Sequence, residues 1–254
     1  MTQTSFGPQL SARGLTRRYG PFLAVDDVDL DLAAGDRHAL IGPNGAGKST
    51  LLNLLAGTIR PTAGQVVLAG RDITRTRPVR RARLGLSRTF QTPAVLESLT
   101  ALDNLVVAAW RHTGTHTAWR PARRRTLAAR GLHRLDEVGL GDHAHTPARE
   151  LSHGQRRLLE IAGALTANPA VLLLDEPAAG LADHDLTLLL DALRRLPAQT
   201  AVLLVEHNQD VVTTLAHTVT VLHHGRVLAT GTPHAIHTHP AVAEVYLGTP
   251  HGTG

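Results

Sequence analysis

The stretch from Arg37 to Gly57 constrains the fold most, because three local patterns follow one another in it without a gap. Residues 37–41 (RHALI) have the apolar character of a short strand, residues 42–50 (GPNGAGKST) contain G-x-x-x-x-G-K-[ST], and residues 49–57 (STLLNLLAG) predict a helix that ends at Gly57. A strand, a glycine-rich loop and a helix in this order predict backbone N–H groups that surround phosphate oxygens at a helix N-terminus. The predicted nucleotide-binding residues of this loop are Gly42, Pro43, Asn44, Gly45, Ala46, Gly47, Lys48, Ser49 and Thr50.

Lys48 is the only lysine in a chain whose lysines and arginines together number 26. A compact ammonium group on a flexible stem can reach between the β- and γ-phosphate oxygens of a nucleotide, whereas a planar guanidinium is wider and fits a narrow loop poorly. Arginine therefore serves wherever any positive charge suffices, and we predict that Lys48 stands where a point charge is needed.

Two further apolar runs predict buried parallel strands that end in polar residues. Residues 170–177 (AVLLLDEP) end in two carboxylates, and residues 200–207 (TAVLLVEH) end at His207. We predict that Asp175 holds Mg²⁺ through water beside Ser49 as a direct ligand, and that Glu176 orients and deprotonates the attacking water. The alternative is that the two acids only cap a turn before a proline. Since ligands bind at the carboxyl ends of strands in open α/β sheets, Lys48, Glu176 and His207 should meet at one edge.

Residues 151–155 (LSHGQ) allow two interpretations. Ser152 and Gln155 form S-x-x-Q before the helical run RRLLEIAGAL, which is the pattern of an ordinary capping box. Capping explains the serine and the glutamine but not Gly154 between them.

Together with the glycine-rich loop and LLLDEP, this pentapeptide resembles the signature of ATP-binding cassette (ABC) ATPases. The resemblance covers roughly residues 10–247 and implies ATP and Mg²⁺ as cofactors. It implies a Q-loop at Gln91 that senses Mg²⁺ and water, a D-loop at 179–183 (AGLAD), and His207 as a switch histidine on the γ-phosphate. It also implies that Tyr19 stacks on adenine beside Val25. In this family Ser152, His153, Gly154 and Gln155 close the nucleotide of an opposing subunit.

More narrowly, DEPAAGLAD, VEHNQDVV and the C-terminal VLATGTPHAIHTHPAVAEVYLG resemble the ATPase subunits of branched-chain amino acid importers, especially the longer of two paired subunits. That resemblance implies an ATPase that powers import on the cytoplasmic face of the membrane. Its implied partners are transmembrane permease subunits, a second ABC ATPase subunit in a homo- or heterodimer, and indirectly a solute-binding protein. Urea, short amides or other amino acids remain alternative solutes. The sequence departs from the family pattern at His153, where glycine is usual, and at Ala182 and Asp183 in the D-loop.

The implied fold is α/β, a P-loop NTPase with a RecA-like core, a small antiparallel β lobe and a helical subdomain. We expect one ABC ATPase domain over residues 1–254. In it, about 10–90 and 166–230 form the ATP-binding core with the β lobe, about 92–165 form the helical subdomain, and about 231–254 form a C-terminal segment. Alternation in 22–33 and the glycine-bounded run 64–70 independently predict strands of the β lobe.

Composition excludes several classes of protein. The chain has no cysteine, which excludes disulfides and thiolate metal sites. No apolar run reaches the roughly 18 residues of a membrane span, and the first ten residues have no basic flank or apolar run, so we expect a cytosolic protein that meets the membrane through a partner. Sixteen histidines include neighbours at 223–224 and 234–239, but none has a carboxylate at a spacing typical of a metal site.

The net charge of +5 raises the question of nucleic-acid binding. The arginine runs at 71–88 and 120–125 are not interleaved with aromatic residues, so we interpret them as a solvated face and expect no nucleic-acid partner. A cassette ATPase acting on DNA or ribosomes remains the alternative function. A P-loop kinase or GTPase would lack LSHGQ, and the guanine motif N-K-x-D would need a second lysine.

Overall fold

The computed structural model describes residues 9–89, 94–113 and 121–247, and within these the strands form two sheets. The strands are β1 Leu10–Tyr19, β2 Phe22–Leu32, β3 Arg37–Ile41, β4 Ala63–Leu68, β5 Arg71–Asp72, β6 Leu86–Arg88, β7 Val171–Asp175, β8 Ala201–Val205, β9 Thr218–His223 and β10 Arg226–Gly231. The α-helices are α1 Lys48–Ala56, α2 Pro78–Arg83, α3 Ala101–Thr113, α4 Pro121–Glu137, α5 His153–Leu165, α6 Asp183–Arg194, α7 Gln209–Leu215, α8 Pro233–His237 and α9 Pro240–Leu247. Two 3₁₀ helices, η2 Gly141–His143 and η3 Ala148–Glu150, precede α5.

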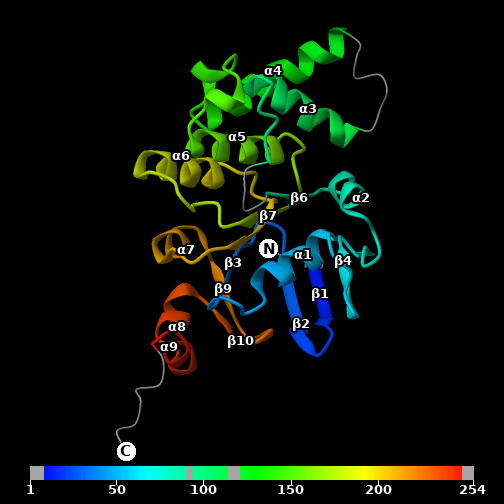
Figure 1. Ribbon diagram of the computed structural model, residues 1–254, viewed down its shortest axis with the longest axis vertical. Helices are drawn as coiled ribbons and strands as arrows, with labels where there is room; N and C mark the ends of the chain where they lie inside the picture. Colours follow the sequence, from blue (N-terminus) through cyan, green and yellow to red (C-terminus); the bar gives the residue numbers. More distant parts are fainter. Residues whose placement is uncertain (1–8, 90–93, 114–120, 248–254) are drawn as a thin grey trace, which may run out of the picture.

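The larger sheet has the order β10-β9-β3-β8-β7-β6, and its pairs from β9 to β6 are parallel (Figure 1). Every residue of β7 and β8 is buried, as the continuous apolar runs predicted. Side chains alternate between the two faces of β7: Leu172 and Leu174 join a core with α5 and α6, while Val171 and Leu173 join a core with α1 and the β lobe. One sheet therefore serves as the common wall of two hydrophobic cores.

The smaller sheet has the order β2-β1-β4-β5 and is antiparallel. Its strand β2 lies at the edge and alternates buried and exposed residues from Val28 to Leu32, which confirms the strand predicted over 22–33. The predicted strand at 64–70 is β4, which begins one residue earlier, at Ala63. This sheet lies beside α1 and carries Tyr19 at the end of β1.

Two arginines of the 71–88 run are not on a solvated face, so that interpretation was wrong for them. Arg81 is fully buried and donates to the carbonyl oxygens of Leu54 (2.9 Å) and Leu55 (2.6 Å) at the end of α1. It also donates to the carbonyls of Thr76 (2.9 Å) and Thr74 (3.0 Å). The last carbonyls of a helix have no partner within the helix, and a guanidinium fork can satisfy several acceptors at once. Arg88 is the second of these arginines, with a side chain only 9% exposed, and it belongs to the site described below.

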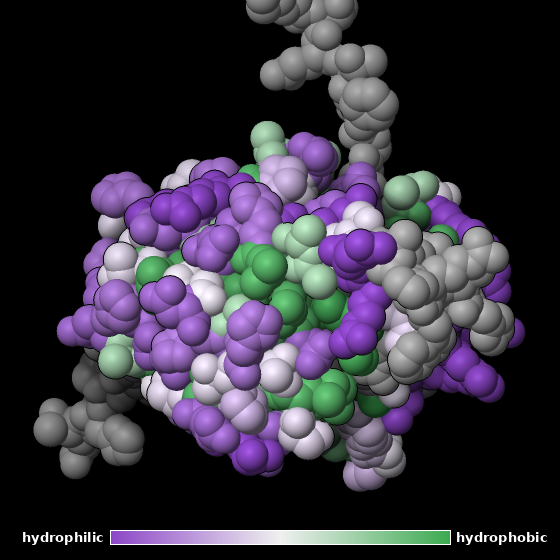
Figure 2. Space-filling view, turned by 90° about the horizontal axis from the view of Figure 1, so that it is seen from above, coloured by the Kyte–Doolittle hydropathy of each residue, from purple (hydrophilic) through white to green (hydrophobic). Residues whose placement is uncertain are grey.

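Helices α3, α4 and α5 pack on one another and form the end of the molecule opposite α8 and α9 (Figure 1). A groove between α3 and α4 is lined by Leu99, Asp103, Val106, Val107, Trp110, Arg124 and Leu127. Figure 2 views the molecule from this side and shows apolar side chains gathered between hydrophilic ones. Among the helices of the described ranges, none combines the length and the apolar character needed to cross a membrane.

His38 supplies a pH-dependent contribution to stability. It lies in β3, it is buried, and its Nε2 is 2.8 Å from the Thr220 hydroxyl. Burial lowers the pKa of His38 from 6.5 to about 4, opposed by the charge of Asp36. In the unfolded chain the imidazole takes up a proton at a higher pH than in the folded protein. The contribution of neutral His38 to stability is therefore fully present above pH 6.5, and it is lost as the pH falls toward 4.

We predict that this group removes roughly 2 to 3 kcal/mol of the unfolding free energy between pH 7 and pH 4.5. Urea unfolding of the wild type and of His38→Gln at both pH values measures the effect, since glutamine can still bond to Thr220 but does not titrate. The loss on acidification should be smaller in the variant by that amount. Equal losses in the two proteins would contradict the assignment.

Candidate functional site

The glycine-rich loop joins β3 to α1 at the carboxyl edge of the larger sheet. Gly42 has φ 150° and Gly47, the N-cap of α1, has φ 103°. A Cβ at Gly42 would overlap the Leu222 carbonyl oxygen, and one at Gly47 would overlap the carbonyl oxygen of Ala24. Both glycines are thus required by left-handed backbone and by close approach of neighbouring main chain. The N–H groups of the first turn of α1 begin immediately after this loop.

Lys48 lies along the loop that it terminates. Its Nζ donates to the carbonyl oxygens of Gly42 (2.6 Å) and Pro43 (3.0 Å). Burial lowers the pKa of Lys48, while the charges of Glu176 and Asp175 act in the opposite direction. The sheet therefore brings the lone ammonium and the two carboxylates to one place, as the strand order β3-β8-β7 requires.

Asp175 ends β7 and is almost fully buried. Its Oδ2 accepts from Arg88 Nη2 at 3.1 Å, and Nη1 of the same guanidinium donates to Asn53 Oδ1 at 2.6 Å. Arg88 thus ties β6, β7 and α1 together around the loop. Sequence reasoning missed Arg88 and Asn53, because single bonds from one guanidinium to residues 35 and 87 positions away leave no local pattern.

The donor set near α1 suits Mg²⁺. Ser49 offers a hydroxyl and Asp175 a carboxylate, both hard oxygen ligands, and Mg²⁺ keeps several waters and takes its other ligands from substrate phosphates. Among the described residues, no group of three or more His, Asp or Glu side chains is placed to hold a metal ion by itself. The residues fit a magnesium ion that arrives with a nucleotide.

Glu176 follows β7 in an uncommon backbone conformation. Its φ is 48°, and its N–H donates to the Val205 carbonyl oxygen at 2.9 Å. A non-glycine residue in the left-handed region persists only where the surroundings fix it. Arg157 of α5 supplies one such contact, since its Nη2 donates to the Glu176 carbonyl oxygen at 2.9 Å.

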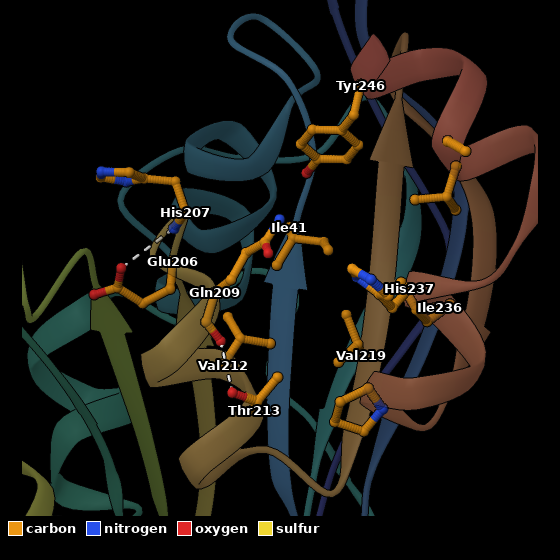
Figure 3. A pocket seen from close by; sticks show the side chains of 13 residues that line it. Ile41, Glu206, His207, Gln209, Val212, Thr213, Val219, Ile236, His237 and Tyr246 are labelled. Carbon is orange, nitrogen blue, oxygen red and sulfur yellow. Dashed lines mark hydrogen bonds between the residues drawn. The ribbon is translucent and has the colours of Figure 1, made fainter.

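His207 lies two residues beyond β8, next to the buried Glu206. The Glu206 carboxylate accepts from the N–H of His207 at 3.2 Å (Figure 3) and also from the N–H of Ala178 at 2.9 Å. The turn that carries His207 and the segment after Glu176 are thereby joined. The sequence shows Glu206 only as the acid before His207, and no pattern indicated its burial.

A cavity of about 320 Å³ separates His207 from the C-terminal helices α8 and α9 (Figure 3). Its walls include Ile41, Val212, Val219, Ile236 and Tyr246. Burial raises the pKa of Tyr246, and the nearby backbone N–H of Gly42 acts in the opposite direction. The C-terminal segment therefore contacts the first residue of the glycine-rich loop.

The pentapeptide LSHGQ begins α5, and its capping box is present. The Gln155 N–H donates to the Ser152 hydroxyl (3.1 Å), and the Ser152 N–H donates to the Gln155 side chain (2.9 Å). Gly154 has a packing reason of its own, because a Cβ there would overlap the Asp185 carboxylate of α6. His153, which stands where the family usually has glycine, is exposed, and its ring lies beside Gly180.

The remaining predicted site residues differ in their exposure to solvent. Tyr19 is 44% exposed, and the Arg17 guanidinium carbon lies 4.4 Å from the centre of its ring. Val25, which the resemblance implies beside Tyr19, is fully buried in the core shared with α1. Gln91 lies outside the described residues.

Comparisons with known proteins decide the family. A family model described as "ABC transporter" matches residues 25–179, and one described as "Branched-chain amino acid ATP-binding cassette transporter" matches residues 226–252. The chain belongs to the ABC transporter family. Its membership confirms the resemblance found in the sequence, and the chain is an ATPase that acts in transport.

Several relatives of this ABC ATPase align over almost its whole length. The branched-chain amino acid transport ATP-binding protein BraF of Pseudomonas aeruginosa is 39% identical over 95% of this chain and 98% of its own. LivG of Escherichia coli, with the same description, is 37% identical over the same shares. A crystal structure of a nucleotide-free ATP-binding cassette superposes with a TM-score of 0.82 at 30% identity, covering 95% of this chain and 100% of that one. The predicted fold class is thereby confirmed.

We predict that Lys48→Arg lowers nucleotide affinity although it keeps the charge. The larger guanidinium cannot follow the path of Nζ past the carbonyls of Gly42 and Pro43. Titration with a fluorescent ATP analogue should show a loss of at least about tenfold, since phosphate contacts depend on the shape of the cation as well as its charge. Arg226→Lys, an exchange at an exposed arginine that pairs with Asp26, is the matched control and should leave affinity unchanged. Unchanged affinity in Lys48→Arg would remove the special role of the lone lysine.

Proposed function

We propose that this ABC ATPase powers the import of branched-chain amino acids. The observation that carries the choice of solute is the match of residues 226–252 to the C-terminal model of branched-chain amino acid cassettes, together with the identity to BraF and LivG. A relative described as the lipopolysaccharide export ATP-binding protein LptB is 36% identical, so the core motifs alone do not choose between import and export.

In the proposed reaction, the loop N–H groups and Lys48 hold the nucleotide phosphates. Glu176 takes a proton from the attacking water, and His207, which follows the neighbouring strand β8, contacts the γ-phosphate. Ser49 and Asp175, with Gln91, would hold Mg²⁺, which would supply positive charge against the negative charge of the phosphate oxygens. Tyr19, with its exposed ring at the end of β1, is the adenine platform. Most of the catalysis is electrostatic, because phosphoryl transfer leaves little covalent work to the protein.

The site is completed by a second cassette. Ser152, His153, Gly154 and Gln155 sit on α5, apart from the loop that begins at Gly42, and we assign them to the nucleotide of the opposing subunit. ATP then joins two cassettes, and hydrolysis separates them. A solved cassette with a TM-score of 0.77 is described as a dimer bound to ADP and Pi, which shows the same fold in a paired form.

The groove between α3 and α4 is the proposed contact with the permease at the cytoplasmic face of the membrane. Val106, Val107 and Leu127 give it an apolar floor, and Asp103 and Arg124 stand at its rim with 3.7 Å between charged atoms. Apolar patches edged by charge are typical of protein interfaces. A solute-binding protein outside the cell would deliver the amino acid to the permease and would not contact this chain.

We predict that Glu176→Gln binds ATP but loses hydrolysis by at least about 100-fold, the size expected for removal of a general base. The variant should also accumulate as an ATP-bound dimer on size-exclusion chromatography with multi-angle light scattering. Glu150→Gln, an exposed acid just before the signature, is the control and should turn over normally. Wild-type turnover in Glu176→Gln would withdraw the assigned role.

We predict that a tagged copy recovers multi-span permease subunits from gently solubilised membranes, and that Val107→Asp abolishes this recovery without affecting ATP binding. A charge in the apolar groove is costly to desolvate at an interface. Leu132→Asp tests an exposed leucine of α4 outside the groove and should preserve recovery.

Leucine uptake by vesicles that hold the recovered complex and the solute-binding protein then tests the solute. ATP-dependent uptake of leucine, isoleucine and valine is the expected result. Uptake of urea or amides instead would show that the assigned solute is wrong, but the assigned transport function would stand. Recovery of ribosomes or nucleic acid without a permease would overturn transport.

A further inference from the structure

We propose that Arg157 and Glu206 are positioning residues that hold the segment 175–178 from opposite sides, and that Arg157 thereby couples the catalytic loop to the signature helix α5. The proposal rests on the assignment of Glu176 as the base. It adds a physical link between the catalytic loop of this chain and the signature residues, which we assign to the nucleotide of the opposing subunit.

Arg157 holds the carbonyl side of this segment. Its side chain is 2% exposed, and it donates to three successive carbonyl oxygens, those of Asp175 and Glu176 through Nη2 and that of Pro177 through Nε. The bond to Glu176 is 2.9 Å and the bond to Pro177 is 3.4 Å. The fork geometry of guanidinium suits several acceptors, whereas an ammonium group is a point charge.

Glu206 holds the N–H side of the same segment. It is 1% exposed and accepts from the N–H of Ala178 at 2.9 Å. It also accepts from the N–H groups of His207 (3.2 Å) and Asn208 (3.4 Å), visible in part in Figure 3. A buried carboxylate is costly without such donors, and three backbone N–H groups offset much of that cost.

The segment between these two charges contains Glu176, the proposed base, in a left-handed backbone conformation. Glu176, at φ 48°, lies between the Asp175 carbonyl held by Arg157 and the Ala178 N–H held by Glu206. The left-handed region costs a non-glycine residue on the order of 1–3 kcal/mol, so fixed neighbours are needed to maintain it. The direction of the Glu176 side chain therefore depends on both buried charges.

The position of Arg157 on α5 links this loop to the signature. It follows Gly154 by three residues and Ser152 by five on the same helix, and Nη1 pairs with Glu160 one turn further on at 2.7 Å. A displacement of α5 when the signature engages a nucleotide moves the guanidinium and, through it, the carbonyl of Glu176. Engagement of one site and placement of the base in the other are thus coupled, and such coupling is reciprocal for binding free energies.

Arg157→Lys is the sharpest test, because it keeps the charge beside Glu160 but removes the fork. We expect ATP affinity within about twofold of the wild type and a fall in kcat of at least about tenfold, since small misplacement of a catalytic group is costly. Glu206→Gln, which loses the charge but keeps an acceptor, should lower kcat in the same direction. The double variant should fall by less than the product of the single effects, because both residues act on one segment.

Arg81→Lys is the matched control. Arg81 is an equally buried arginine that donates to four carbonyl oxygens, but none of them belongs to segment 175–178. Arg81→Lys should lower the thermal unfolding temperature, because it affects stability. The kcat of the folded variant should stay within about twofold of the wild type. An equal loss of kcat in Arg81→Lys would reduce the Arg157 effect to general destabilisation.

The coupling is measured in the Glu176→Gln background. There Arg157→Lys should weaken ATP-induced dimer formation by at least about threefold, the size of ordinary coupling free energies, whereas Arg81→Lys should not. Normal kcat in folded Arg157→Lys overturns the proposal, and if that variant does not fold, normal kcat in Glu206→Gln overturns it. Hydrolysis by Glu176→Gln itself would instead remove the base assignment on which the proposal rests.

Discussion

Parallel pairing of β3, β8 and β7 is the constraint on which the rest of this structure depends. The register that sets Leu40 beside Val205, and Val205 beside Asp175, brings three carboxyl ends to the same level of one sheet edge. The residues that follow these strands are the glycine-rich loop, Glu176 and His207. Helix α1 then directs its N-terminus at the same edge, so the positive end of the helix and Lys48 face two carboxylates.

Buried charges stabilise this edge where apolar side chains could not. Arg88, Arg157 and Glu206 are all nearly inaccessible, and each contacts main chain or side chains of the loops around the site. Loops cannot satisfy their backbone groups by regular pairing, so charged side chains supply the missing donors and acceptors. Buried ion pairs in proteins can often be replaced by hydrophobic residues of similar volume without loss of stability. Here such replacements would be destabilising, because they would leave those backbone groups unsatisfied.

Most of the fold and the central part of the candidate site could be predicted from local patterns. The strand β3, the helix end at Gly57 and the capping box at Ser152 were all predicted from neighbouring residues, since each depends on interactions within a few positions. Arg81 and Arg88 were misread as solvated, because a run of arginines looks the same whether its members face water, a carbonyl 27 residues away or a carboxylate 87 residues away. The resemblance implied Val25 beside Tyr19, and only the structure shows that the Val25 side chain is fully buried in the core shared with α1.

The sequence by itself determined the chemistry at the sheet edge: a glycine loop with one lysine, two acids after a buried strand and a histidine after the next. These features are local, and their spacing fixes which side chains can follow which strand. Only the tertiary structure decided which buried charges hold that chemistry in place, how Glu176 adopts its left-handed backbone, and that Tyr246 of the C-terminal helix reaches Gly42. These contacts join segments far apart in the chain, and their partners are backbone groups, which every residue carries and which therefore leave no mark in the sequence.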